Sequence, residues 1–573
     1  GGMTDAAPTG AAAPEPLDHV ESGLAHHFAG RLAKAEAAYK RALSKNPKDS
    51  GALHLLGLLA ADKGKYKRAL QLIEKALAVD PKNANFLHSA GHVLSQLGQI
   101  EQAVDRYSAA LDQEPDRPLT LSNLGNALRR LGKFEDAAKC LARAVEIDMG
   151  FAEGWSNLGL VEKERGAYTE AKDAFNRAMA LRPENPAFRF NLANAEREAG
   201  DFDAAIEGYK DVLAQAPAHG GAHLNLAAAL KAKGDYQGAK TAIKFSLNAL
   251  PPDHPEVAEL HWNLALLHLT TGEWEQGWEE FEWRRHMPDY GGVEPKLQEW
   301  KGDLLAGRHI VVNHEQGLGD AFQFMSYARD LAAQDAYVIY RGPKSMCPVM
   351  AQMTGVQETV AFEDPLPEAD CWAPMMSLPR LLGLTETAKL QRGGTLTVDP
   401  ALLAPFKARI EDARGLKIGI CWQGNPDYRN DRDRSIPLPA FQALARIPGV
   451  TLFSLQKGPG SEQVAEWPSD LALVDLGAEI DQAHGAFMES AAVIKALDMV
   501  VSSDTAIAHL AGALGADVHV ALTRTPDWRW GLEGEHSVWY PSMTLHRQSR
   551  AGDWVEVFER IKELIQGRSA GHG

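Results

Sequence analysis

The chain has 573 residues, which is too long for one hydrophobic core and predicts several domains. Its net charge of −17 argues against a general nucleic-acid-binding protein, because such a protein needs a basic face. The sequence has no run of eighteen apolar residues and no signal peptide, so we expect a soluble, cytoplasmic protein without membrane insertion.

The first sixteen residues differ in composition from the rest of the chain. Gly1 and Gly2 precede Met3, as in a remnant of cloning. The stretch from Thr4 to Pro16 is rich in alanine, proline and glycine. We therefore expect residues 1–16 to form a disordered tail.

Residues 17–290 repeat themselves with a period of 34 residues. Glycine marks the period at Gly30, Gly64, Gly98, Gly132, Gly166, Gly200 and Gly234, and at Gly272 after an insertion. Each unit predicts two helices that are joined at this glycine and ended by proline. The pattern resembles the tetratricopeptide-repeat family, which implies an α-solenoid with a groove that binds polypeptide.

One column of the repeats is occupied by asparagine. Its members are Asn123, Asn157, Asn191, Asn225 and Asn263, whereas the first two units carry Leu55 and Ser89 there. An amide both donates and accepts hydrogen bonds, so a row of amides can hold the backbone of an extended peptide. The column resembles the asparagine ladder of the O-GlcNAc transferase repeats and predicts acceptor binding. The alternative is that each amide satisfies neighbouring groups within the array.

The last unit is rich in tryptophan, at Trp262, Trp274, Trp278 and Trp283. The end of a solenoid needs a cap, and large aromatic side chains suit docking onto another domain. We interpret this cluster as an interdomain core rather than a platform for sugar. Residues 291–306 then form a linker.

From residue 307 onward, short apolar runs alternate with helical stretches. Runs at 309–314, 336–341 and 358–362 predict the strands of a first lobe over residues 307–400. Runs at 417–425, 451–458, 471–477, 498–503 and 518–522 predict a second lobe over residues 401–573, closed by a helix at 554–565. Two such Rossmann-like lobes resemble the GT-B glycosyltransferase fold. The predicted fold class is therefore α + α/β, with an α-solenoid followed by a GT-B-like region.

Two motifs in these lobes resemble those of known enzymes. GLGDAFQF (317–324) and SSDTAIAHLAGALG (502–515) are similar to motifs of heptosyltransferase-type enzymes. With the repeats and PDWRWGLEGE (526–535), they resemble bacterial flagellin-modifying (FlmG-type) protein glycosyltransferases. This resemblance implies inverting transfer of a nonulosonic acid, such as pseudaminic acid, to Ser or Thr of flagellin. It implies a CMP-linked nucleotide sugar as co-substrate and no other cofactor.

The first motif carries the candidate catalytic residues. By the resemblance, Asp320 is the general base that takes the proton of the acceptor hydroxyl. His314 and Glu315 lie on the same loop and are the runner-up bases. The alternative for Asp320 is a structural one, in which it caps the helix that follows the loop.

The second lobe carries the candidate donor site. We expect the backbone N–H groups of the turn Ser503-Asp504-Thr505 to bind the departing phosphate, with His509 one helical turn further on. Arg434 and Lys457 follow strands and can add positive charge, although a solvated surface is the alternative for each. Gly424 allows close backbone approach and Asn425 can bond sugar or base. Trp528, Arg529 and Trp530 are expected to shape the same pocket.

No metal is expected. Asp431 and Asp433 match a D-x-D pattern, but they lie in a charged loop rather than at the end of a strand. The leading hypothesis is therefore a metal-independent protein O-glycosyltransferase that holds its protein acceptor on the repeats. One alternative is a transferase of the same fold that acts on a glycan or a lipid-linked acceptor. The other is a repeat scaffold without catalysis.

Overall fold

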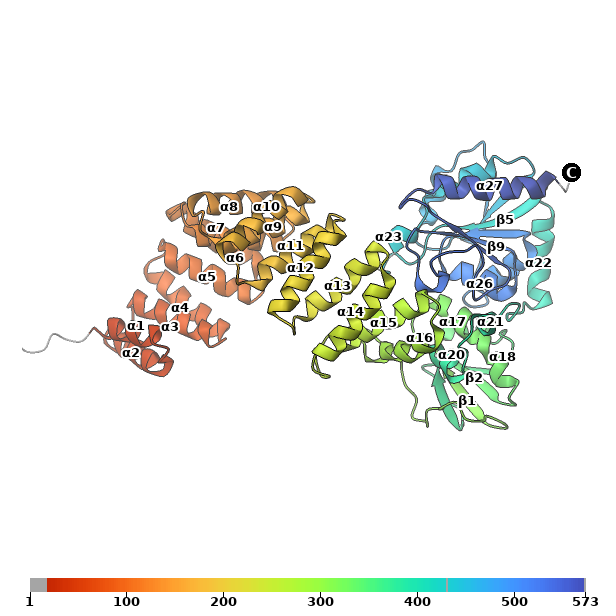
Figure 1. Cartoon of the computed structure of the whole chain (residues 1–573), viewed down its shortest axis with the longest axis horizontal. Coiled ribbons are helices and arrows are strands. Elements are labelled where there is room, and N and C mark those ends of the chain that lie inside the picture. The colour runs from red at the N-terminus through yellow and green to blue at the C-terminus, as the bar shows by residue number, and fades with distance from the viewer. Residues whose placement is uncertain (1–17, 429–430, 571–573) are drawn as a thin grey trace, which may run out of the picture. The chain divides into compact units, whose positions relative to one another are not determined.

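The computed structural model describes residues 18–428 and 431–570 (Figure 1). The predicted tail of residues 1–16 lies outside the described residues. The chain divides into two compact units, the first ending at Asp235 and the second beginning at Tyr236. The boundary thus falls inside the repeats.

The first unit is a row of helices, most of them packed in antiparallel pairs (Figure 1). They are α1 (His19–Phe28), α2 (Leu32–Lys45), α3 (Ser50–Asp62), α4 (Tyr66–Val79), α5 (Ala84–Gln96), α6 (Ile100–Gln113), α7 (Pro118–Arg130), α8 (Phe134–Ile147), α9 (Ala152–Glu164), α10 (Tyr168–Leu181), α11 (Pro186–Glu198), α12 (Phe202–Gln215) and α13 (Gly220–Lys233). No helix in the described ranges combines the length and apolar character that crossing a bilayer requires.

The predicted glycine turns are confirmed. The glycines between the paired helices, from Gly30 to Gly234, have φ angles between 71° and 91°, a region that side chains with a Cβ rarely adopt. Small residues let the paired helices approach, since Ala69, Ala103 and Ala137 are fully buried. The sequence period therefore sets both the turn and the close packing of each pair.

The second unit begins with three more repeat helices, α14 (Tyr236–Ala249), α15 (Val257–Thr270) and α16 (Trp274–Phe281), and the 3₁₀-helix η1 (Glu282–His286). Trp274 and Trp278 are buried and pack edge-on against Trp539, with ring centroids 5.6 and 6.2 Å apart. Trp278 also meets Trp528 at 6.0 Å and donates its indole N–H to the carbonyl of Leu384 at 3.0 Å. The predicted interdomain core is confirmed for these two tryptophans.

The first α/β region is a four-stranded parallel sheet in the order β3-β2-β1-β4. Its strands are β1 (His309–Asn313), β2 (Tyr337–Gly342), β3 (Val356–Ala361) and β4 (Cys371–Pro374), with helices α17 (Leu318–Phe324), η2 (Met325–Tyr327), α18 (Ala328–Ala332), η3 (Lys344–Met346), α19 (Cys347–Met350), η4 (Met375–Ser377), α20 (Leu378–Leu381) and α21 (Thr387–Leu390). The three predicted strands are confirmed. Strand β4, which has only four residues and ends in proline, was not predicted.

The second α/β region is a six-stranded parallel sheet in the order β10-β9-β8-β5-β6-β7. Its elements are α22 (Pro400–Glu411), β5 (Leu416–Cys421), α23 (Asp431–Arg434), η5 (Leu438–Phe441), α24 (Gln442–Ala445), β6 (Val450–Ser454), η6 (Ser461–Glu466), β7 (Leu473–Asp475), α25 (Met488–Ala496), β8 (Met499–Ser502), α26 (Ala506–Leu514), β9 (Val518–Leu522), η7 (Trp528–Trp530), β10 (Met543–Arg547) and α27 (Val555–Ser569). Five strands and the closing helix were predicted. The edge strand β10, half polar in sequence, was missed.

Candidate active site

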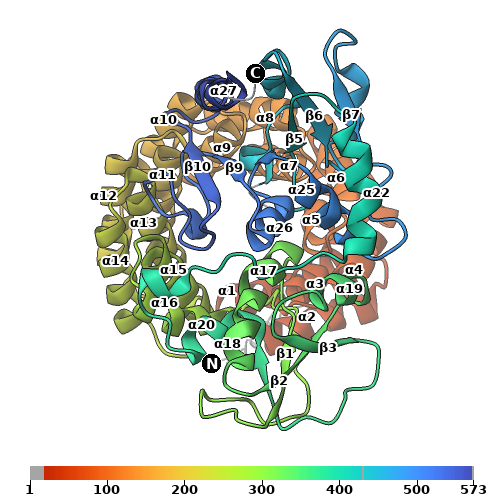
Figure 2. The ribbon, with the colours of Figure 1, turned by 90° about the vertical axis from the view of Figure 1, so that its right-hand side faces the viewer.

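The two sequence motifs meet in space. Helix α17 follows β1 and helix α26 follows β8, and the two helices pack against each other between the two sheets (Figure 2). A Cβ added to Gly319 would lie 3.3 Å from the Cα of Ala506 and 3.3 Å from the ring of His509. The first turns of these helices therefore touch at Gly319, where a side chain would press against α26. Residues almost two hundred positions apart in the sequence share one junction.

Asp320 lies in the first turn of α17 at this junction, with its side chain 16% exposed. Its Oδ2 accepts a hydrogen bond from the backbone N–H of Gly317 at 2.9 Å, so the capping role is present. Its Oδ1 accepts a hydrogen bond from the guanidinium of Arg529, which belongs to η7 in the second α/β region. Burial raises the pKa of Asp320, and the positive charge of Arg529 opposes this rise.

The runner-up bases are both engaged in other contacts. The Nδ1 of His314 lies 2.9 Å from the hydroxyl of Tyr340, and its Nε2 lies 3.3 Å from the carbonyl of Gln316. Burial lowers the pKa of this histidine. Glu315 forms a bidentate pair with Arg284 at 2.8 and 2.9 Å and also accepts the N–H of Met376 at 2.9 Å. The geometry thus favours Asp320 over both.

The predicted phosphate turn lies between β8 and α26. Ser503 is fully buried, and its hydroxyl has no partner among the described residues. Asp504 has its pKa raised to about 6, mainly by burial and then by the nearby charge of Asp527. Thr505 is buried, with its hydroxyl 3.2 Å from that of Ser502. The turn is thus closely packed and carries a carboxylate of its own.

His509 is buried on α26, with its Nδ1 2.8 Å from the hydroxyl of Tyr540 and its ring stacked on Trp530. Burial, with Arg529 and Arg434 nearby, lowers the pKa of His509 to about 3. Its imidazole is therefore neutral near pH 7, so it can form a hydrogen bond with a substrate but does not supply a positive charge.

Buried histidines predict a loss of stability in acid. The pKa of His509 is lowered to about 3 and that of His546 to about 4, whereas an unfolded histidine titrates near 6.5. Below pH 6.5 both histidines bind a proton in the unfolded chain but stay unprotonated in the folded protein. Stability should therefore fall from pH 7 to pH 5, by about 2 kcal/mol for each histidine. Urea denaturation at both pH values measures this difference.

Two variants separate this effect from the titration of carboxylates. His509→Gln should reduce the difference in unfolding free energy between pH 7 and pH 5. The control is the same exchange at His286, which is exposed on η1. An equal pH difference in the wild type and in His509→Gln would exclude His509 as a source of the acid sensitivity.

The remaining donor candidates divide into two groups. Gly424 lies against Arg434, since a Cβ there would come within 2.5 Å of the guanidinium. Arg434 stacks over the ring of Tyr428 at 4.5 Å and pairs with Asp431 at 3.1 Å. Its charge also acts on Asp504 and His509, which places it near the phosphate turn.

The other donor candidates are directed elsewhere. Lys457 donates to the backbone carbonyls of Ile480 at 2.8 Å and Asp481 at 3.1 Å, and Asn425 accepts the N–H of Asp427 in a local turn. Among residues 18–428 and 431–570, no group of three or more His, Cys, Asp or Glu is arranged to hold a metal ion. Arg434 is thus the better placed of the two predicted cations.

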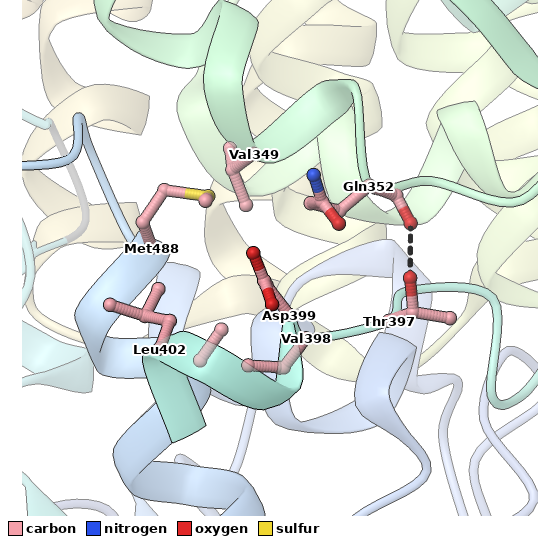
Figure 3. Close-up of a pocket in the computed structure, with 8 residues that line it drawn as sticks. Val349, Gln352, Thr397, Val398, Asp399, Leu402 and Met488 are labelled. Atoms are coloured by element: carbon pink, nitrogen blue, oxygen red, sulfur yellow. Dashed lines mark hydrogen bonds between the residues drawn. The ribbon is translucent and has the colours of Figure 1, made fainter. Parts of the chain in front are cut away.

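A separate hollow lies between α19, α22 and α25, with Val349, Asp399 and Met488 among its lining residues (Figure 3). The hydroxyl of Thr397 donates to the carbonyl of Gln352 at 3.2 Å at one side of it. The hollow has no room for a water molecule. It is a packing gap rather than a binding site.

The asparagine column is half-buried in all five units. In the first unit of the structure, Asn157 donates to the hydroxyl of Ser122 at 3.0 Å, and Asn191 donates to that of Ser156 at 3.4 Å. Each bond joins one repeat to the repeat before it. His54 and Ser89 are joined at 2.8 Å with the same spacing of 35 residues, although the column has no asparagine there. The amides of Asn157 and Asn191 thus bond within the array, as the structural alternative predicts.

Two residues of the junction have contacts that the sequence does not predict. Arg529 was expected only to shape a pocket, yet it contacts Asp320 directly. Gln323 accepts the Nε–H of Arg529 at 2.6 Å, while its own amide nitrogen is buried without a partner among the described residues. Gln323 follows Asp320 by three positions, which places both on one face of a helix. That spacing is the signal that could have identified it.

Comparison with known proteins bears first on the helical half. Two family models described as tetratricopeptide repeat match the chain. One matches residues 60–119 and 196–264, and the other matches residues 21–84, 122–187 and 156–219. The chain carries tetratricopeptide repeats. A relative, Protein FlbA of Caulobacter vibrioides (strain ATCC 19089 / CIP 103742 / CB 15), is 26% identical over 348 residues. This match covers 56% of the present chain, and the chain spans only 57% of that protein's length.

Solved structures with similarity to the repeats include three proteins. A tetratricopeptide repeat protein from Parabacteroides merdae ATCC 43184 is 21% identical, with a TM-score of 0.35, over 44% of this chain and 97% of that one. YrrB, described as a TPR protein with an unusual peptide-binding site, is 23% identical, with a TM-score of 0.29, over 32% and 95%. PilF of Pseudomonas aeruginosa is 22% identical, with a TM-score of 0.31, over 34% and 89%.

Proposed function

We propose that the protein is a metal-independent, inverting protein O-glycosyltransferase with a GT-B catalytic half. Tetratricopeptide repeats are modules of protein–protein interaction and would hold the protein acceptor. The two α/β regions would transfer a sugar from a nucleotide sugar to a Ser or Thr hydroxyl. The observation that carries this proposal is the position of Asp320, a carboxylate at the junction of both α/β regions, beside the helix of the phosphate turn.

The proposed step uses four groups of this chain. Asp320 takes the proton of the acceptor hydroxyl, whose oxygen attacks the anomeric carbon from the face opposite the phosphate. The bond from that carbon to the phosphate oxygen breaks, and the phosphate leaves with the electron pair. The N–H groups of the turn at Ser503–Thr505 and the guanidinium of Arg434 would stabilise the leaving group. His509, being neutral, would act as a hydrogen-bonding group.

The acceptor and the donor are proposed from the motifs. The resemblance to flagellin-modifying transferases supports flagellin as the acceptor and a CMP-linked nonulosonic acid, such as pseudaminic acid, as the donor. The same resemblance supports action in the cytoplasm. A glycan or lipid-linked acceptor, or a scaffold without catalysis, are the competing functions.

Intact-mass measurement tests the proposal. Purified protein is incubated with flagellin and, in separate reactions, with CMP-, UDP-, GDP- and ADP-sugars. We expect flagellin to gain the mass of one or more sugars with one donor class. A gain on a glycan acceptor alone would favour the first competing function. No gain with any acceptor, together with no binding of any donor, would favour the scaffold.

Acceptor binding by the asparagine column makes a separate prediction. Exchange of Asn157, Asn191 and Asn225 for alanine removes three amides and should weaken flagellin binding about 100-fold, at roughly 1 kcal/mol per hydrogen bond. Isothermal titration calorimetry measures this affinity, and donor binding should not change. Asn176→Ala, on the exposed side of α10, is the control. Unchanged flagellin affinity with a lower melting temperature would mean that the column only joins the repeats.

A further inference from the structure

Arg529 connects the second α/β region to the proposed base. It lies on η7, 209 residues beyond Asp320, and its side chain is 12% exposed. One terminal nitrogen donates to Asp320, the other donates to Asp527 at 2.8 Å, and Nε donates to Gln323 at 2.6 Å. All three nitrogens of the guanidinium are thus used, and two of them are directed at α17.

The ring of Trp528 and a backbone contact hold Arg529 in place. The guanidinium lies over the indole of Trp528 at 4.6 Å, and the carbonyl of Arg529 accepts the indole N–H of Trp539 at 2.8 Å. Both tryptophans belong to the buried cluster that includes Trp278 of the last repeat. A planar guanidinium stacked on an aromatic ring presents its donors in fixed directions, which a flexible lysine cannot do.

The groups around Asp320 have opposite effects on its pKa. Burial raises the pKa of its carboxyl, and Asp527 and Glu315 raise it further. Arg529 and the N–H of Gly317 lower it. Glu315 is paired with Arg284, whereas Asp320 is paired with Arg529. A base has to be ionised before it can accept a proton, so this contact bears on the chemistry.

We propose that Arg529 is a positioning residue that keeps Asp320 as an oriented carboxylate, ready to take the proton of the acceptor hydroxyl. This inference rests on the proposed function. Arg529 fixes Oδ1 while the N–H of Gly317 fixes Oδ2, so the carboxylate plane is set from both sides. Each oxygen retains a lone pair for the hydroxyl. The base is complete only when residues of both α/β regions are in place.

The dependence of kcat/KM on pH tests this proposal. For the wild type, kcat/KM rises with pH as Asp320 ionises. Arg529→Met should move this rise to higher pH by at least one unit, so that kcat/KM falls at least tenfold at pH values below the wild-type rise and recovers at pH values above the shifted one. Arg529→Lys, which keeps the charge, should restore the position of the rise but not the full kcat. Arg524→Met, at an exposed arginine of the same loop, is the control.

A measurement without substrate separates this inference from the proposed function. The ¹³C NMR signal of the Asp320 carboxyl, identified by its loss in Asp320→Asn, should titrate at higher pH in Arg529→Met than in the wild type. If the wild type transfers no sugar, the function fails, yet this titration still tests Arg529. An unmoved titration, or a loss of kcat/KM that is equal at every pH, would overturn the proposal. Should Arg529→Met not fold, Arg529→Gln, which is also uncharged, takes its place.

Discussion

Asp320→Asn is expected to lower kcat by about 10²–10⁴-fold while donor binding stays unchanged, because it removes the group that takes the proton. The amide has nearly the same size, and its oxygen can still accept the N–H of Gly317. Arg529 keeps its contact with Asp527, so no unpaired charge is buried in the variant. Single-turnover transfer to flagellin measures the rate, and calorimetry measures donor affinity.

The control is Asp364→Asn, at an exposed carboxylate of the same α/β region. This variant should retain the rate of the wild type. Normal turnover by Asp320→Asn would show that Asp320 is only a helix cap, which its bond to Gly317 already makes it. His314 would then be the next residue to test, although its two ring nitrogens would first have to leave Tyr340 and Gln316.

Arg284→Met is expected to lower the free energy of unfolding by about 3–5 kcal/mol, because it leaves the carboxylate of Glu315 buried without its partner. Both side chains are 1% exposed, and the pair joins the last repeat to the loop after β1. A second exchange, Glu315→Gln, removes the stranded charge and keeps an acceptor for the N–H of Met376. Arg284→Met with Glu315→Gln should therefore regain most of the loss in urea denaturation.

A neighbouring arginine provides the matched comparison. Arg285 pairs with Glu294 and Glu299 but is 18% exposed, so Arg285→Met should cost no more than about 1 kcal/mol. Equal losses for the two arginine variants would show that burial does not dominate this network. A double variant less stable than Arg284→Met alone would show that Glu315 is not the stranded charge.

The sequence predicted the repeats well because one physical requirement recurs in each. Every turn needs a residue that tolerates positive φ, and every pair needs small side chains where the helices touch. The strands buried on both faces were also visible as apolar runs. Strand β4 is apolar but has only four residues and ends in Pro374, whereas β10 is interrupted by Thr544 and His546. Short or half-polar strands depend on their neighbours in the sheet, which the sequence does not reveal.

The candidate site was only partly predictable. Strand–turn–helix order placed Asp320 and His509 at the ends of parallel strands, and the structure brings their helices together. The order of strands, turns and helices does not predict where long side chains point. Lys457 turns to two carbonyls, and Arg529 reaches a carboxylate 209 residues away. The contact of Arg529 depends on how the two sheets meet, and those of Lys457 depend on a loop of its own sheet, and no local pattern encodes either.

The boundary between the two compact units, at residues 235 and 236, lies within the repeats and determines which repeats can be removed or exchanged. Helix α16 supplies Trp274 and Trp278 to the core around Trp528 and Trp539, so the last repeat belongs to the folding of the α/β half. Repeats before Tyr236 contact mainly their own neighbours, as in any solenoid. Shortening, extending or exchanging the array ahead of this point should therefore leave the hydrophobic core of the α/β half intact.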